Sequence, residues 1–305
     1  MPDTIFGPIA TVPNCFGQVV PIYALRYDKK GELLSPQSLD DVLSYINDAG
    51  VTDILFYSHG WNNDFPTAKA RYEEFLIGVS DASKTHPGLL PPGFKPVLVG
   101  VIWPSTILVW PKEQAPDIAA APSAESFEEV LALLSPGLRA RLEKTLTAGE
   151  QNQSEDARQL ADELAAALPA PEEDENDTDP YGPEDLLEAW KVLAETHGEA
   201  PAQPGGFAEF GGISLDGDPA VAGLFGFDPR ILLRAPTVLM MKDRAGVVGA
   251  RGVADALGRL LNGSQARLHL FGHSYGAKVV STALVRANAG RKAQSLTLLQ
   301  PAINH

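Results

Sequence analysis

The 305-residue chain lacks features that would place it in several large classes of protein. It contains a single cysteine, Cys15, so no disulfide can form within the chain, and we expect a reducing compartment, the cytoplasm. No stretch approaches the roughly 18 uninterrupted apolar residues of a transmembrane helix, so no transmembrane segment is predicted. The first residues, MPDTIFGPIATVPN, have neither the basic start nor the long apolar run of a secretory signal.

Basic stripes and metal-binding patterns are also missing from the sequence. The formal net charge is −15, and no basic stripe is present that would neutralise phosphates, so a nucleic-acid partner is not expected. The six histidines are scattered. His269 and His273 straddle a strand and a turn instead of sharing one helix face, so we predict no metal site, and no cofactor is predicted either.

The negative charge is concentrated in the middle of the chain. Of the 39 acidic and 24 basic residues, residues 106–235 hold 26 and 8, which leaves 13 acidic and 16 basic residues elsewhere. This contrast divides the chain into a core, residues 1–105 and 236–305, and an acidic, mostly helical insertion, residues 106–235. Within the insertion, short helices are expected at about 124–134, 136–148, 154–168 and 183–197, and the run PEEDENDTDP (171–180) predicts a solvated linker.

Strand and helix patterns alternate through the core. Apolar runs predict strands at 18–27, 51–60, 95–105, 266–271 and 295–302, and amphipathic patterns predict helices at 38–50, from about 66, at 248–261 and at 276–289. Pro21 suggests that the first of these strands lies at an edge of the sheet, and Ser38 is the expected N-cap of the first helix. The alternation predicts an α/β fold, a mostly parallel sheet with helices on both faces.

The strongest chemical signal is the stretch HLFGHSYGAK, residues 269–278. An apolar strand leads into Gly272-His273-Ser274-Tyr275-Gly276, and a helix-like segment follows. In a nucleophile elbow, small residues two before and two after the serine let strand and helix approach closely. The pattern therefore predicts Ser274 as a catalytic nucleophile; an ordinary glycine-rich turn is the alternative.

A second signal follows an earlier strand, in YSHGWNND, residues 57–64. Acyl transfer needs two backbone N–H donors aimed at the developing oxyanion, one after the nucleophile and one on an upstream loop. We predict the N–H groups of Tyr275 and Trp61 in these roles. Gly60 would let the backbone turn close to the substrate, and His59 would bond carbonyls of the loop.

Together these motifs resemble the α/β-hydrolase superfamily, and within it the bacterial serine-esterase-like group with an HGYN-type oxyanion loop, a W-P-S after the next strand and an H-S-x-G elbow. This chain has His59-Gly60-Trp61-Asn62, Trp103-Pro104-Ser105 and His273-Ser274-Tyr275-Gly276, with Trp61 where the group has tyrosine. The resemblance covers about residues 18–105 and 235–305. It implies an α/β-hydrolase fold, a serine hydrolase of small-molecule or lipid-like acyl esters, and a cap or lid formed by the insertion.

The chain departs from that family after the nucleophile. In the superfamily the triad acid and histidine follow later strands, but no Asp or Glu follows Ser274, and the only later histidine is His305. We expect the last strands, the acid and the base to come from a further C-terminal segment or a partner chain. Alternatives are a rearranged triad that uses Asp243 or His59, and a catalytically inert interaction module. A peptidase or thioesterase would use the same machinery as an esterase.

Overall fold

The computed structural model describes residues 7–61, 63–86, 88, 90–105, 134–137, 139, 154–168, 180–189 and 229–302. The chain forms two compact units, one of Met1–Thr106 and Lys242–His305 (unit 1) and one of Ile107–Met241 (unit 2). The boundaries expected from the charge pattern were 105/106 and 235/236. None of the helices in the described ranges is both long enough and apolar enough to cross a membrane.

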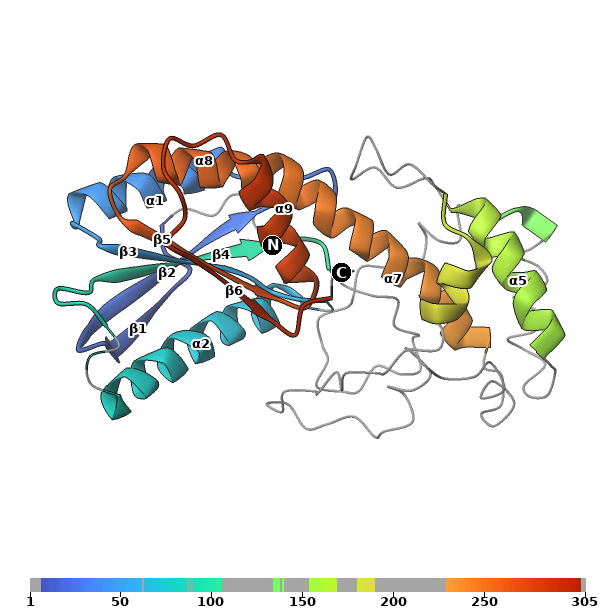
Figure 1. The fold of residues 1–305 in the computed structure, drawn as a ribbon, viewed down its shortest axis with the longest axis horizontal. Coiled ribbons are helices and arrows are strands. Elements are labelled where there is room, and N and C mark those ends of the chain that lie inside the picture. The colour runs from blue at the N-terminus through green and yellow to red at the C-terminus, as the bar shows by residue number, and fades with distance from the viewer. Residues whose placement is uncertain are drawn as a thin grey trace. The chain divides into compact units, whose positions relative to one another are not determined.

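Unit 1 is built on a six-stranded sheet of order β1-β2-β4-β3-β5-β6 (Figure 1). Its strands are β1 (Ala10–Cys15), β2 (Gln18–Arg26), β3 (Asp53–Ser58), β4 (Pro96–Ile102), β5 (Arg267–His273) and β6 (Ser295–Leu299). Only β1 pairs antiparallel, with β2, and the four other pairings are parallel. The prediction of an α/β protein with a mostly parallel sheet is therefore confirmed.

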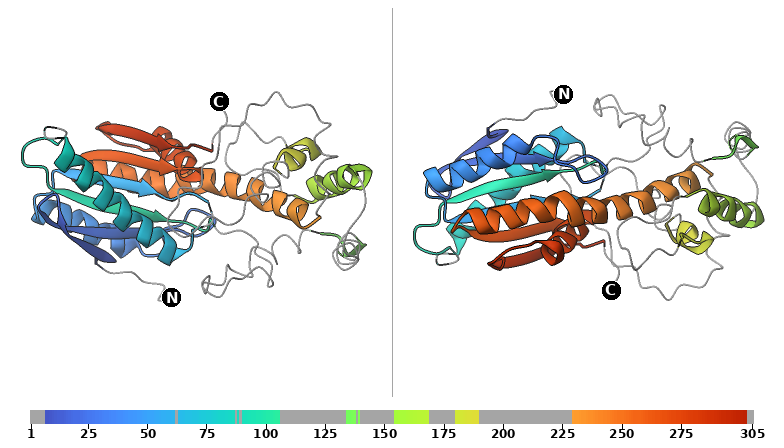
Figure 2. Two further views of the ribbon diagram at one scale, coloured as in Figure 1. Left: turned by 90° about the horizontal axis from the view of Figure 1, so that it is seen from below. Right: turned by 90° about the horizontal axis from the view of Figure 1, so that it is seen from above.

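Helices cover both faces of this sheet. Helix α2 (Phe65–Thr85) lies on one face, whereas α1 (Pro36–Asp48), α8 (Ala254–Gly263) and α9 (Tyr275–Arg286) lie on the other (Figures 1 and 2). Helix α7 (Pro229–Val248) continues through a π-helical turn, Gly249–Val253, into α8. The sequence pattern at 248–261 thus corresponds to the end of one long helical run.

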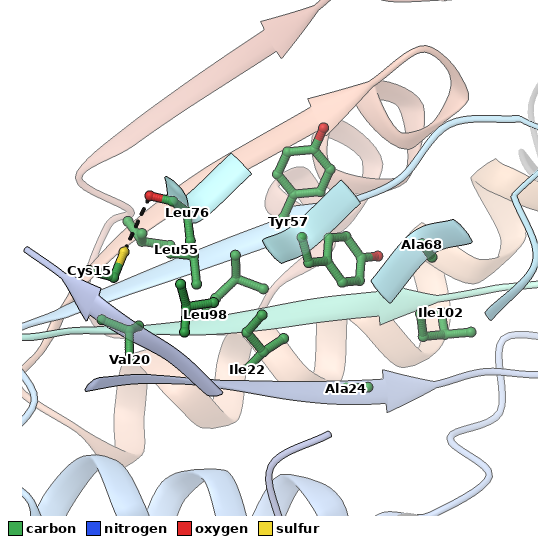
Figure 3. Packing of buried hydrophobic residues seen from close by; sticks show 12 residues of the cluster. Cys15, Val20, Ile22, Ala24, Leu55, Tyr57, Ala68, Leu76, Leu98 and Ile102 are labelled. Carbon is green, nitrogen blue, oxygen red and sulfur yellow. Dashed lines mark hydrogen bonds between the residues drawn. The ribbon is translucent and has the colours of Figure 1, made fainter. Parts of the chain in front are cut away.

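The hydrophobic core under α2 combines alternate residues of the strands with one stripe of the helix (Figure 3). Val20, Ile22 and Ala24 of β2 project to this side because side chains alternate along a strand. Full burial of an aliphatic side chain contributes about 1.5–3 kcal/mol. Cys15 belongs to the same cluster, and its thiol donates to the carbonyl of Leu76 at 3.3 Å. Burial raises the pKa of this thiol, which suits a packing role.

Two local predictions are wrong, one because of strand pairing and one because the helix begins earlier than expected. Pro21 does not mark an edge, because β2 lies between β4 and β1, a strand that the sequence did not suggest. The ladder with β4 begins only at Ile22, so the missing N–H of proline removes no hydrogen bond from it. Helix α1 begins at Pro36 after Ser35, and Ser38 is a buried residue of its first turn, not the N-cap.

A buried carboxylate links the amino ends of β3 and β5. Asp53, 1 % exposed, accepts two hydrogen bonds from Arg267, at 2.8 and 2.7 Å, and one from Thr52 at 2.6 Å. Nε2 of His269 lies 3.0 Å from the same carboxylate. Burial alone would raise the pKa of Asp53, but these hydrogen bonds outweigh it and hold the pKa below its usual value. The pairing ties two neighbouring strands together.

Unit 2 has its own small hydrophobic cluster. Helix α5 (Ser154–Ala167) contributes Ala161, Leu164 and Ala165, which pack with Leu134, Leu186, Ala189 and Leu239. The helix predicted at 154–168 is thereby confirmed. Residues 169–179, which hold most of the predicted acidic linker, and most of the helix candidates at 124–134 and 136–148 lie outside the described residues. The role of the insertion as a lid stays a prediction.

Candidate active site

Three of the motifs that the sequence analysis selected meet at one edge of the sheet. They follow β3, β4 and β5, which are neighbours in the order β4-β3-β5 and run parallel. The carboxyl ends of parallel strands lie on the same edge, where α/β proteins usually bind ligands (Figure 1). Residues 59–61, residues 103–105 and the Ser274 turn are therefore brought together although they are far apart in sequence.

Ser274 has an unusual backbone conformation. It joins β5 directly to α9 with φ 53° and ψ −125°, and its side chain does not cap the helix. A non-glycine residue held in a sparsely populated region costs on the order of 1–3 kcal/mol, so the surrounding structure has to enforce it. Its N–H donates to the carbonyl of Leu299 at 3.0 Å, and its carbonyl accepts from the N–H groups of Ala277 at 2.9 Å and Ala302 at 3.3 Å.

Glycines make this turn sterically possible. A Cβ on Gly272 would lie 2.5 Å from Cα of Ala277, and a Cβ on Gly276 would lie 2.2 Å from the carbonyl oxygen of Ser58. A Cβ on Gly60 would lie 2.8 Å from Cβ of Ser274. Real Cβ atoms do not approach other atoms this closely, so strand, helix and the upstream loop can meet at Ser274 only through glycine.

The loop after β3 is held by residues that follow β4. The indole Nε1 of Trp103 donates to the carbonyl of His59 at 3.1 Å. The hydroxyl of Ser105 accepts from the N–H of Asn63 at 3.3 Å and donates to its carbonyl at 3.1 Å. Asn63 in turn donates through Nδ2 to the carbonyls of Gly60, at 3.0 Å, and Trp61, at 2.7 Å. No role for the W-P-S motif could be predicted from its residues alone, and no local pattern indicated Asn63.

His59 is a structural residue of this loop. It is 1 % exposed, its Nδ1 lies 2.8 Å from the carbonyl of Gly60, and its ring stacks on Trp103 with centroids 5.7 Å apart. Burial lowers its pKa to about 4, although the bond to Gly60 opposes the shift. A neutral imidazole must donate from Nδ1 to that carbonyl. So weak a base is a poor proton acceptor at neutral pH, which argues against His59 as the general base.

The buried, neutral state of His59 predicts an acid-sensitive fold. An unfolded histidine takes up a proton near pH 6.5, whereas folded His59 does so only near 4, so the free energy of unfolding should fall as pH drops between these values. This group should account for about 3 kcal/mol of that loss. Urea unfolding at pH 7 and pH 4 measures it: His59→Gln should lose less stability on acidification than the wild type.

His86 supplies the control for this experiment, because it is an exposed histidine just after α2. His86→Gln should leave the difference between the two pH values as it is in the wild type. An equal pH dependence in His59→Gln and in the wild type would show that His59 is not the buried neutral group described.

The residues flanking Ser274 have distinct environments. Nε2 of His273 lies 3.3 Å from Oε1 of Gln300, and burial, assisted by the nearby charge of Arg71, lowers the pKa of His273. Tyr275 is the first residue of α9, so its N–H is one of the helix-start donors that have no partner within the helix. Burial raises the pKa of its phenol to about 12, so the hydroxyl stays neutral.

The described residues do not place the predicted catalytic acid and general base beside Ser274. Asp243 lies in α7, and His305 lies outside the described residues. Among the described histidines, only His269 is hydrogen-bonded to a carboxylate, and that pair lies toward the amino ends of β3 and β5. Nor do any three His, Cys, Asp or Glu side chains of the described ranges gather into a potential metal site.

No protein-family model, curated protein or solved structure shows significant similarity to the chain.

Proposed function

We propose that the chain is a serine hydrolase of the α/β-hydrolase type that cleaves an ester-type acyl substrate through an acyl-enzyme on Ser274. One observation carries the proposal: the strained backbone of Ser274, with φ 53°, at the turn between β5 and α9. Strained residues cluster at functional sites. A serine on a sharp strand-to-helix turn, with glycine two residues before and two after it, is the arrangement of a nucleophile elbow.

The neighbouring backbone supports acyl-transfer chemistry. The N–H of Tyr275 lies at the positive end of the α9 dipole, where negative charge is stabilised. The loop that carries Trp61 packs against the serine through Gly60, and Asn63, Trp103 and Ser105 hold it in place. Donors fixed before the reaction stabilise an oxyanion without reorganisation. We assign the N–H groups of Tyr275 and Trp61 to this role.

The reaction that follows from this assignment has two halves. Ser274 Oγ bonds to the carbonyl carbon of the ester, its proton passes to a base, and the carbonyl oxygen becomes an oxyanion. As the oxyanion collapses, the ester C–O bond breaks and the leaving alcohol takes the proton. Water then attacks the acyl-enzyme by the same route, which releases the acid and restores the Ser274 hydroxyl.

A fluorophosphonate probe tests the nucleophile directly. The folded chain should form one covalent adduct, which peptide mass spectrometry should place on Ser274, because the phosphonyl group mimics the tetrahedral intermediate. Protein denatured before addition of the probe should not react, since unfolding separates the serine from the groups that activate it. An unmodified Ser274, or an adduct on another residue of the folded chain, would refute the assignment.

A catalytically inert module remains the second candidate, because the described residues place no histidine–carboxylate pair beside Ser274. Hydrolysis of p-nitrophenyl butyrate separates the two. The hydrolase proposal expects turnover that disappears when Ser274 carries the probe. A folded chain that neither forms the adduct on Ser274 nor releases p-nitrophenol above the level of the denatured protein would support the inert module.

A further inference from the structure

A second strained residue lies beside Ser274. Gln300, directly after β6, has φ 45°. In the β5–β6 ladder the last paired residues are His273 and Leu299, so Ser274 and Gln300 are the next residue on each strand. Two neighbouring parallel strands thus leave the sheet at the same level, each through a left-handed residue that is not glycine. Glutamine is not among the residue types that favour this region.

The last residue of β6 and the segment that follows it bind both backbone polar groups of Ser274. The carbonyl of Leu299 accepts from the Ser274 N–H at 3.0 Å, and the N–H of Ala302 donates to the Ser274 carbonyl at 3.3 Å. Leu299 is itself anchored, because its side chain packs against the hydrophobic cluster under α2. A bond from His273 Nε2 to Gln300 Oε1, at 3.3 Å, joins the two turns through their side chains.

We propose that Gln300 is a positioning residue for Ser274. Because the backbone of Gln300 is left-handed, the chain that leaves β6 turns back toward Ser274. Leu299 and Ala302 can then bind the N–H and the carbonyl of Ser274, and these two hydrogen bonds hold the serine in its strained conformation. The inference rests on the proposed function, because these hydrogen bonds matter for catalysis only if Ser274 Oγ is the nucleophile. The backbone conformation of residue 300 provides most of this positioning of Ser274, and the side chain of Gln300 contributes only a minor part.

Two substitutions separate backbone from side chain. Gln300→Gly removes the side chain but favours the left-handed backbone, whereas Gln300→Val disfavours it because a β-branched residue strongly resists positive φ. The measurement is the second-order rate constant for phosphonylation of Ser274. Since small misplacements of a reacting group lower rates steeply, Gln300→Val should react at least about tenfold more slowly, and Gln300→Gly should stay within about threefold of the wild type.

The control is Gln294, an exposed glutamine just before β6 whose backbone is not left-handed. Gln294→Val should react as the wild type does. Thermal melting of each variant shows whether a slower reaction accompanies loss of the fold. If Gln300→Val does not fold, Gln300→Ala takes its place against Gln300→Gly, since alanine also disfavours positive φ.

Amide hydrogen exchange tests the hydrogen bonds between Ser274 and residues 299–302 independently of catalysis. The amides of Ser274 and Ala302 should be protected in the wild type and in Gln300→Gly, and should exchange at least about tenfold faster in Gln300→Val because their hydrogen bonds open locally. If wild-type Ser274 does not react with the probe, the proposed function fails. The exchange data still show whether the backbone of Gln300 holds the Ser274 turn in place. Wild-type exchange and reactivity in Gln300→Val, or equal losses in the glycine and valine variants, would overturn the inference.

Discussion

Replacing Ser274, the proposed nucleophile, with alanine is expected to abolish the ester hydrolysis that the wild-type chain shows, because no acyl-enzyme can form without the serine hydroxyl. The variant should also form no adduct with a fluorophosphonate. The fold should survive, since the serine side chain caps no backbone group of α9. Alanine also has the same Cβ as serine, so the positive φ at this position costs both residues about the same. Initial rates with p-nitrophenyl butyrate and intact-mass spectrometry measure the two effects.

Ser281 provides a matched control on the same helix. It lies within α9, and its hydroxyl is buried without a hydrogen-bond partner among the described residues, so Ser281→Ala removes the same atom without breaking a bond. This variant should keep wild-type labelling and turnover. If Ser274→Ala retained more than a few per cent of the wild-type rate, the nucleophile would have to be another residue.

The largest effect on stability is expected from Gly276→Ala. The added Cβ would lie 2.2 Å from the carbonyl oxygen of Ser58 and 2.5 Å from that of His59. Both are backbone atoms, and Ser58 is paired on its two sides with Val101 and Gly272, so the strand cannot retreat without breaking its ladders. We expect a loss of about 3 kcal/mol from overpacking. The Tm of the chain should then fall by about 10 °C.

Gly78 is the control for this substitution. It lies in α2, and a Cβ there would meet nothing within 4 Å. Gly78→Ala should therefore raise stability by about 0.5–1 kcal/mol, because alanine loses less conformational freedom in a helix. Equal melting temperatures for Gly276→Ala and the wild type would mean that α9 does not approach the end of β3 as closely as described.

The elements that carry the site could be read from local pattern. The apolar runs at 51–60 and 266–271 predicted β3 and β5 because fully or half-buried strands need apolar side chains at consecutive or alternate positions. The spacing of Gly272 and Gly276 around Ser274 predicted a close strand-to-helix turn, since only glycine leaves room for it. These are properties of a few neighbouring residues, so the sequence by itself determines them.

Only the tertiary structure decided which distant residues support that turn. Trp103, Ser105 and Asn63 hold the loop after β3 through hydrogen bonds that exist only once β3 and β4 are paired. Gln300 reaches the Ser274 turn only because β6 lies beside β5 in a particular register. For the same reason β1 was missed and Pro21 was misplaced. Strand order and register depend on contacts between remote segments, and no local pattern encodes them.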